Sequence, residues 1–104
     1  MNRNMDLVRD ILIVFYDGGG LNDPRLSDRY DKESVYCNFD LCKDAGFIDD
    51  KYKLTWAGFE FVAKYKDDTT WNRISKVLKY NGISASMFAI DVFYESILRD
   101  EIII

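Results

Sequence analysis

The chain has 104 residues, a net charge of -4 and no histidine. Its length suits one domain, and 48% hydrophobic residues are enough for a packed core. The acidic balance argues against a dedicated nucleic-acid binder, because Lys and Arg contacts to phosphates supply most of the affinity of such proteins. The lack of histidine removes the usual general base and transition-metal ligand, so we expect no enzyme activity, no metal site and no cofactor.

The sequence gives no sign of a membrane segment or of a disulfide. No stretch reaches the roughly 20 apolar residues of a membrane span, and the first residues open a helical pattern instead of a signal-peptide core. Cys37 and Cys42 lie five residues apart in a predicted helix, so their side chains point about 140° apart and cannot easily bridge. We therefore expect a cytoplasmic protein with two reduced, mostly packed thiols and no membrane contact.

The first half of the chain predicts two helices. Apolar residues recur at helical spacing over residues 5–16, and three glycines at 18–20 end this helix. Residues 21–30 are rich in turn formers and predict a loop, or a short helix at most. A second helix is predicted over residues 31–45, with Val35, Phe39 and Cys42 on its apolar stripe and Gly46 as its cap.

The second half predicts a short hairpin followed by three helices. Residues 47–48 and 52–54 are interpreted as two brief strands around a polar turn at 49–51. Helices are predicted over residues 56–66 and 71–80 and from about residue 84 or 86 onward. Trp56, Phe59, Val62 and Ala63 form the apolar stripe of the helix after the hairpin, and we expect both Trp56 and Trp71 in the core.

This order of elements predicts the fold class: mainly α with a small two-stranded β-hairpin, in a winged-helix-like single domain over residues 1–104. In that architecture the helix before the wing enters the DNA major groove, and here it is the helix over residues 31–45.

The last predicted helix has a broad apolar stripe. A terminal helix with that much apolar surface must dock on its own domain or on another copy, because such a patch is rarely left in water. A homodimer through this helix is therefore one expectation. Its candidate residues are Ile90, Phe93, Tyr94, Ile97 and Leu98.

Three stretches carry more specific motifs: residues 3–12 (RNMDLVRDIL), residues 35–48 and residues 54–72. The last combines Leu-Thr-Trp-x-Gly with Asp-x-Thr-x-Trp. Together the three stretches resemble a family of small bacterial and phage proteins catalogued as domain of unknown function 2513. The resemblance implies a winged-helix-like fold and a frequent home in prophages or mobile elements, with no activity to carry over. Asn38 and Phe59 stand where that family is associated with histidines.

The first functional hypothesis is DNA-associated transcriptional regulation, which the expected architecture and the resemblance favour. Three residues of the helix over 31–45 could contact bases, and four basic residues could reach phosphates. Against this, the helix carries four acidic residues and only two lysines, so phosphates would repel it. The candidate DNA-binding residues are Arg25, Arg29, Ser34, Tyr36, Asn38, Lys51 and Lys53.

The alternative hypothesis is a protein-interaction module. An acidic face made of Glu33, Asp40 and Asp44 would meet a basic surface on a host or phage protein. That protein could be a nucleic-acid-binding enzyme, which would be inhibited when the acidic side chains occupy its DNA site. This hypothesis accounts for the net charge and for the apolar last helix.

Overall fold

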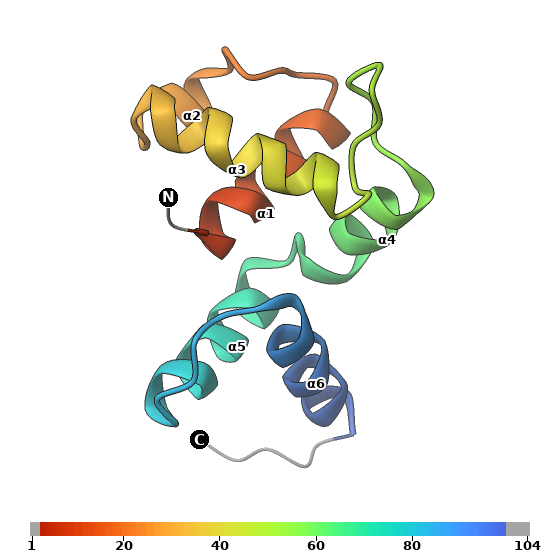
Figure 1. The fold of residues 1–104 in the computed structure, drawn as a ribbon. Coiled ribbons are helices and arrows are strands. Elements are labelled where there is room, and N and C mark those ends of the chain that lie inside the picture. The colour runs from red at the N-terminus through yellow and green to blue at the C-terminus, as the bar shows by residue number, and fades with distance from the viewer. Residues whose placement is uncertain (1–2, 100–104) are drawn as a thin grey trace. The chain divides into compact units, whose positions relative to one another are not determined.

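The structure is a computed structural model that describes residues 3–99. These residues form six helices, drawn in Figure 1, and the chain divides into two compact units. The first unit ends at Lys66 and the second begins at Asp67. The helices are α1 (Met5–Tyr16), α2 (Pro24–Ser27), α3 (Lys32–Asp44), α4 (Trp56–Tyr65), α5 (Asp68–Tyr80) and α6 (Met87–Leu98).

The predicted β-hairpin is wrong, and with it the winged-helix fold class. Residues 3–99 contain no strand, and an isolated antiparallel bridge between Ile48 and Leu54 is all that remains of the hairpin. The Asp49 carboxylate accepts hydrogen bonds from the backbone N–H groups of Lys51 (2.8 Å) and Lys53 (3.0 Å). Such local side-chain bonds give the backbone an alternative to a strand ladder. The described residues therefore form an all-helical fold with a closed loop in place of the wing.

In the first unit, α1 packs against α2, α3 and α4. Asn4 caps this helix, because its side chain accepts a hydrogen bond from the backbone N–H of Leu7. Leu7, Ile11 and Leu12 are completely buried. Burial of each such side chain contributes about 1.5–3 kcal/mol to folding. The α1 stripe therefore forms the centre of this core, as the periodicity predicts.

The buried side chain of Arg9 ties α1 to the end of α4. Its Nε donates to the carbonyl oxygen of Tyr65 (2.7 Å), and its Nη2 donates to that of Lys66 (2.9 Å). The last carbonyls of a helix have no partner within the helix and carry partial negative charge, so a guanidinium is a suitable cap. Arg9 thereby fixes where α4 ends.

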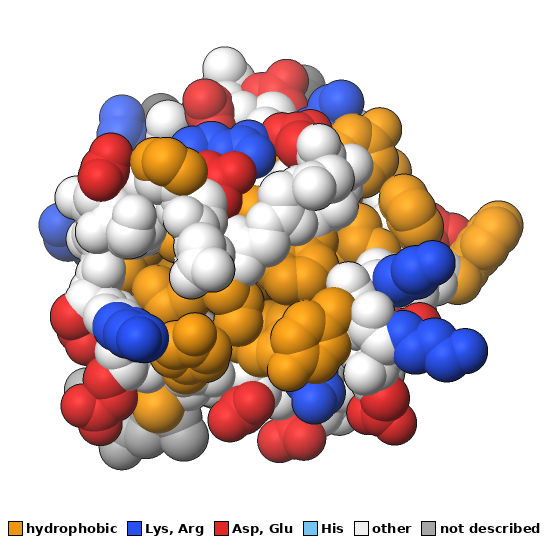
Figure 2. Space-filling view, turned by 90° about the horizontal axis from the view of Figure 1, so that it is seen from above, with side chains coloured by type: hydrophobic (Ala, Val, Ile, Leu, Met, Phe, Trp, Pro, Cys, Tyr) orange, Lys and Arg blue, Asp and Glu red, His pale blue; other side chains and the backbone are white. Residues whose placement is uncertain are grey.

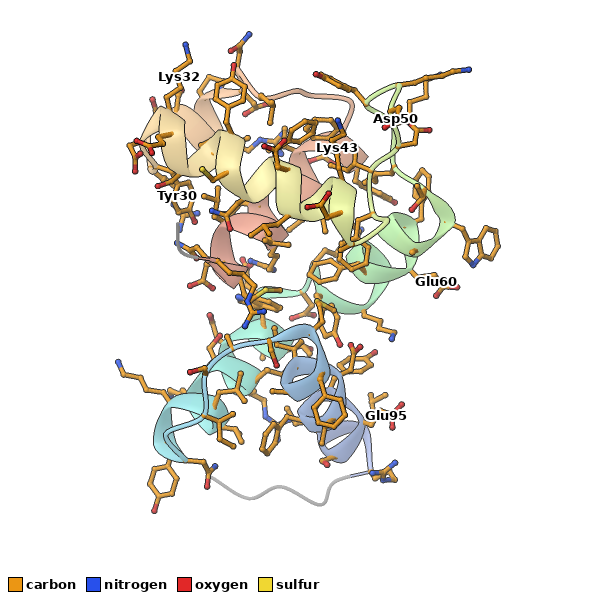
Figure 3. The ribbon with its side chains drawn as sticks, in the orientation of Figure 1. Tyr30, Lys32, Lys43, Asp50, Glu60 and Glu95 are labelled. Carbon is orange, nitrogen blue, oxygen red and sulfur yellow. The ribbon has the colours of Figure 1, made fainter. Side chains whose placement is uncertain are left out.

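An aromatic contact holds the loop after α3. Tyr52 has a positive φ of 63°, which is costly for a bulky residue. Its ring packs edge-on against Phe39 (centroids 5.2 Å apart), and the Lys43 ammonium lies 5.6 Å from the Tyr52 centroid. Figure 3 places Lys43 on the side of α3 that faces the loop with Asp50. These contacts offset the backbone strain and fix the loop on α3.

The second unit consists of α5 packed against α6. Asp67 caps α5 by accepting hydrogen bonds from the backbone N–H groups of Thr69 and Thr70, and Ser86 caps α6. Trp71 is only 4% exposed, so its predicted place in the core is confirmed. The Asp-x-Thr-x-Trp motif is thus a helix cap followed by a buried anchor.

Candidate functional site

The Leu-Thr-Trp-x-Gly motif builds the start of α4. Thr55 caps the helix, since its Oγ1 accepts the N–H of Gly58 and donates to the carbonyl of Gly46. Leu54 forms the isolated bridge with Ile48. At Gly58 a Cβ would overlap the carbonyl oxygen of Phe47, so this buried position needs glycine. Leu54, Thr55 and Gly58 therefore all serve the fold.

Trp56, the central residue of this motif, serves no such purpose. Its side chain is 82% exposed, so its predicted place in the core is wrong. The buried face of α4 contains Gly58, Phe61, Val62 and Tyr65. At 100° per residue, Trp56 lies about 160° around the helix from Gly58. The first residue of α4 thus points to solvent.

A shallow groove of about 250 Å³ runs along this exposed side of α4. The groove, called the α4 groove below, is lined by Trp56, Phe59, Glu60 and Ala63. These residues are spaced three and four apart, so they are neighbours on one helix face. Small-molecule sites usually have volumes of about 300–1,000 Å³, so the α4 groove has the size for one side chain and not for a cofactor.

Phe59, which lines the α4 groove, is held in place by a residue of α1. The Phe59 ring packs edge-on against Tyr16, with the centroids 6.0 Å apart, and Lys66 Nζ lies 5.4 Å from the Tyr16 centroid. Phe59 and Tyr16 are nevertheless 50% and 44% exposed. The aromatic surface therefore continues from α4 onto the end of α1, and its rings have defined partners.

Glu60 is the charged residue of the α4 groove. It projects outward from α4 in Figure 3, and its side chain is exposed. No cation among residues 3–99 forms an ion pair with its carboxylate. The α4 groove therefore combines two aromatic rings, a methyl group and one carboxylate available to a partner.

Two of the predicted phosphate-binding residues are bound to carboxylates of the chain itself. Arg25 pairs with Asp17 (2.6 Å) and Asp23 (3.0 Å), and Arg29 pairs with Asp10 (3.1 Å). The hydrogen bonds from Arg25 lower the pKa of Asp23 below its ordinary value. Phosphate contacts by either arginine would have to compete with these pairs.

Two of the predicted base-reading residues are structural. Asn38 is 1% exposed; its Oδ1 accepts the Asn4 N–H (2.9 Å) and its Nδ2 donates to the Ser34 carbonyl (2.9 Å). The Ser34 hydroxyl donates to Asp31 (2.7 Å), and this bond lowers the pKa of Asp31. Asn38 therefore fixes α3 to the start of α1 and does not face an external ligand.

The three other predicted DNA contacts lie on the surface. Tyr36 is 44% exposed, with the Lys32 ammonium 5.8 Å from its ring centroid. Lys51 and Lys53 are exposed in the loop between α3 and α4. Of the seven predicted residues, only Asn38 is buried, whereas both arginines are exposed and already paired with carboxylates of the chain.

The predicted acidic face is present on α3. Glu33, Asp40 and Asp44 are all exposed, and their spacing of seven and four residues places them within about 40° on one side of the helix. Among the described residues, none of the three carboxylates pairs with a cation. Figure 2 shows a hydrophobic area bordered by acidic and basic side chains on the face seen from above.

The predicted dimer stripe on α6 is only partly exposed. Ile90 is 1% exposed, whereas Leu98 is 67% exposed. Phe93, Tyr94 and Ile97 are half-buried. The most exposed apolar side chain of α6 is Phe88, at 80%, which the prediction left out. A homodimer through this helix stays a prediction.

None of the helices in residues 3–99 has the length and apolar character needed to cross a membrane.

Comparison with known proteins gives the chain's relatives. Residues 2–84 match the family described as hypothetical protein (DUF2513). An uncharacterized protein of Haemophilus influenzae is 30% identical over 113 residues, covering 94% of this chain and 96% of that protein. No solved structure matches the chain. The resemblance seen in the sequence motifs is therefore confirmed, and the chain belongs to the DUF2513 family.

Proposed function

We propose that this protein is a protein-interaction module that binds a segment of another protein in the α4 groove. The observation that carries the proposal is the 82% exposure of Trp56, at the first residue of a helix whose other motif residues hold the fold. Large aromatic side chains dominate the binding energy of protein interfaces. The exposure of Trp56 supports a role as such an anchor.

The energy available from this anchor is substantial. A tryptophan buries up to about 250 Å² when it is covered, and each Å² of apolar surface is worth about 25 cal/mol. Covering Trp56 would thus contribute on the order of 4–5 kcal/mol before the costs of association. Most of the Trp56 surface stays in contact with water in the folded chain, so a partner that covers the α4 groove would gain this free energy on binding.

The charge of the molecule favours a basic partner. The chain carries a net charge of -4, and the stripe of Glu33, Asp40 and Asp44 on α3 adds a local negative field. Complementary charge speeds encounter and selects partners more than it raises affinity, and salt weakens it. The acidic stripe would therefore steer a basic protein toward this unit while the α4 groove anchors it.

DNA-associated regulation stays a prediction, and the contacts above favour the protein interaction over it. Arg25 and Arg29 would have to exchange carboxylates of the chain for phosphates, and Asn38 would have to leave the core. A protein partner requires neither change.

Photo-crosslinking tests the proposal. We would place p-benzoylphenylalanine at position 57, which is exposed next to Trp56 and leaves the groove residues in place, and, as a control, at position 80, where Tyr80 is exposed (85%) but lies on α5. The expected result is a protein adduct from position 57 that position 80 does not give. The variant Ala63→Leu, which fills the α4 groove without removing any of its groups, should abolish this adduct.

Three outcomes would contradict the proposal. The first is the same set of adducts from both positions, and the second is an adduct that survives Ala63→Leu. The third is an adduct sensitive to nuclease instead of protease, which would return attention to DNA. Once the partner is identified, calorimetric titration with the purified chain and with Ala63→Leu would measure the loss of affinity directly.

A further inference from the structure

We infer that the α4 groove takes an arginine side chain of its partner, an inference that rests on the proposed function and specifies its chemistry. The juxtaposition behind it is that of Trp56, Phe59 and the unpaired Glu60 around a space of about 250 Å³. Each of these groups favours a planar cation, and they lie on one helix face.

The two rings favour a cation of low hydration. Tryptophan is the best aromatic acceptor of a cation, and a guanidinium also stacks flat on its face. Phe59 supplies a second ring whose orientation is fixed by its contact with Tyr16. A guanidinium between them keeps its edge free for hydrogen bonds, since stacking uses only its faces.

Glu60 supplies the acceptor for that edge. It lies four residues after Trp56, so the two side chains are neighbours on α4, about 5–6 Å apart at Cβ. A carboxylate binds guanidinium through two parallel hydrogen bonds, a geometry that an ammonium cannot copy. No described cation occupies this position, so the carboxylate is open to a partner.

Hydration of the cation decides between arginine and lysine in the α4 groove. The methyl group of Ala63 leaves room at the end of the groove, where a longer side chain would fill it. An ammonium is compact and strongly hydrated, so it loses more on entering a groove that offers a single carboxylate among apolar groups. Arginine is therefore the side chain that satisfies both the rings and Glu60.

An NMR titration tests this inference without the natural partner. The probe is the blocked peptide acetyl-Leu-Ala-Arg-Ala-Leu-amide, and its control carries citrulline, the neutral isostere, in place of arginine. The readout is the indole N–H signal of Trp56, assigned by its loss in Trp56→Phe; the buried Trp71 gives the internal reference. A lysine peptide of the same sequence completes the series.

We expect the arginine peptide to shift the Trp56 signal with an affinity at least about tenfold above that of the citrulline and lysine peptides. Glu60→Gln should reduce the arginine peptide to the level of citrulline. Equal shifts from all three peptides, or no shift from any, would overturn the inference. Crosslinking that is lost in Ala63→Leu but unchanged in Glu60→Gln would support the proposed function. The same result would refute the inference that the groove takes an arginine.

Discussion

Gly58→Ala should destabilise the protein although it replaces glycine by the best helix former. The added Cβ would overlap the carbonyl oxygen of Phe47 and lie 2.9 Å from Leu54 Cδ2. Overpacking of this kind costs about 1–3 kcal/mol, and contact with a rigid backbone atom belongs at the upper end. The gain in helix propensity returns about 1 kcal/mol. The net loss is therefore about 2 kcal/mol.

Urea denaturation followed by far-UV circular dichroism measures this loss. For a chain of this size it corresponds to a decrease in Tm of about 8–16 °C. The control is Gly20→Ala, because a Cβ at Gly20 meets nothing within 4 Å and Gly20 does not need a positive φ. Its stability should be unchanged or slightly higher. Equal stability of Gly58→Ala and Gly20→Ala would refute the close approach of α4 to Phe47.

Three further predictions concern other parts of the structure. Arg9→Met should lower the free energy of unfolding, measured by urea denaturation, by about 2–3 kcal/mol, because it removes two charge-assisted hydrogen bonds to the end of α4. Arg9→Lys should recover only part of this stability. Full stability of Arg9→Met would contradict the role of Arg9 as a cap. Burial raises the pKa of the Cys42 thiol to about 12, so a disulfide reagent at pH 8 should label only Cys37 in the folded protein. Rapid labelling of both cysteines would contradict the burial of Cys42 in the core. The pKa of Asp31 is lowered on folding, so its stabilisation is complete above about pH 4 and is lost as the pH falls through the lower folded value. Asp31→Asn keeps a cap and should flatten the acid dependence of the urea midpoint, whereas an unchanged dependence would contradict the Ser34–Asp31 contact.

Helix positions could be predicted from the sequence because local signals mark them. The predicted first helix coincides with α1, since its apolar stripe begins after a capping Asn4 and glycines follow it. The helix over residues 31–45 matches α3 within one residue at each end. The hairpin prediction failed for an equally local reason, because the Asp49 carboxylate accepts the backbone N–H of Lys53 that the second strand would have paired.

The sequence-based prediction missed the candidate site because it assigned the buried apolar stripe of α4 to the wrong side of the helix. Trp56, Phe59 and Ala63 do recur at helical spacing, but the buried stripe is the one with Gly58, Phe61, Val62 and Tyr65. Gly58 was the available signal, because a glycine within a helix often marks close approach to another backbone. The opposite side, with Trp56, is then the exposed one. Asp23 is a local partner of Arg25, but Asp17 lies eight residues before Arg25 and Asp10 lies 19 residues before Arg29, so only the fold could reveal these two pairs.

The proposed role of Trp56 is contact with a partner and not stabilisation of the fold. The free energy of unfolding of Trp56→Ala tests it directly, with Trp71→Ala as the comparison. We expect a change within about 0.5 kcal/mol for Trp56→Ala, as for surface substitutions in general. Trp71→Ala, which removes a buried side chain, should lower the free energy of unfolding by about 3–5 kcal/mol. A loss of stability in Trp56→Ala comparable to that in Trp71→Ala would show that the Trp56 ring belongs to the core and would contradict its proposed role.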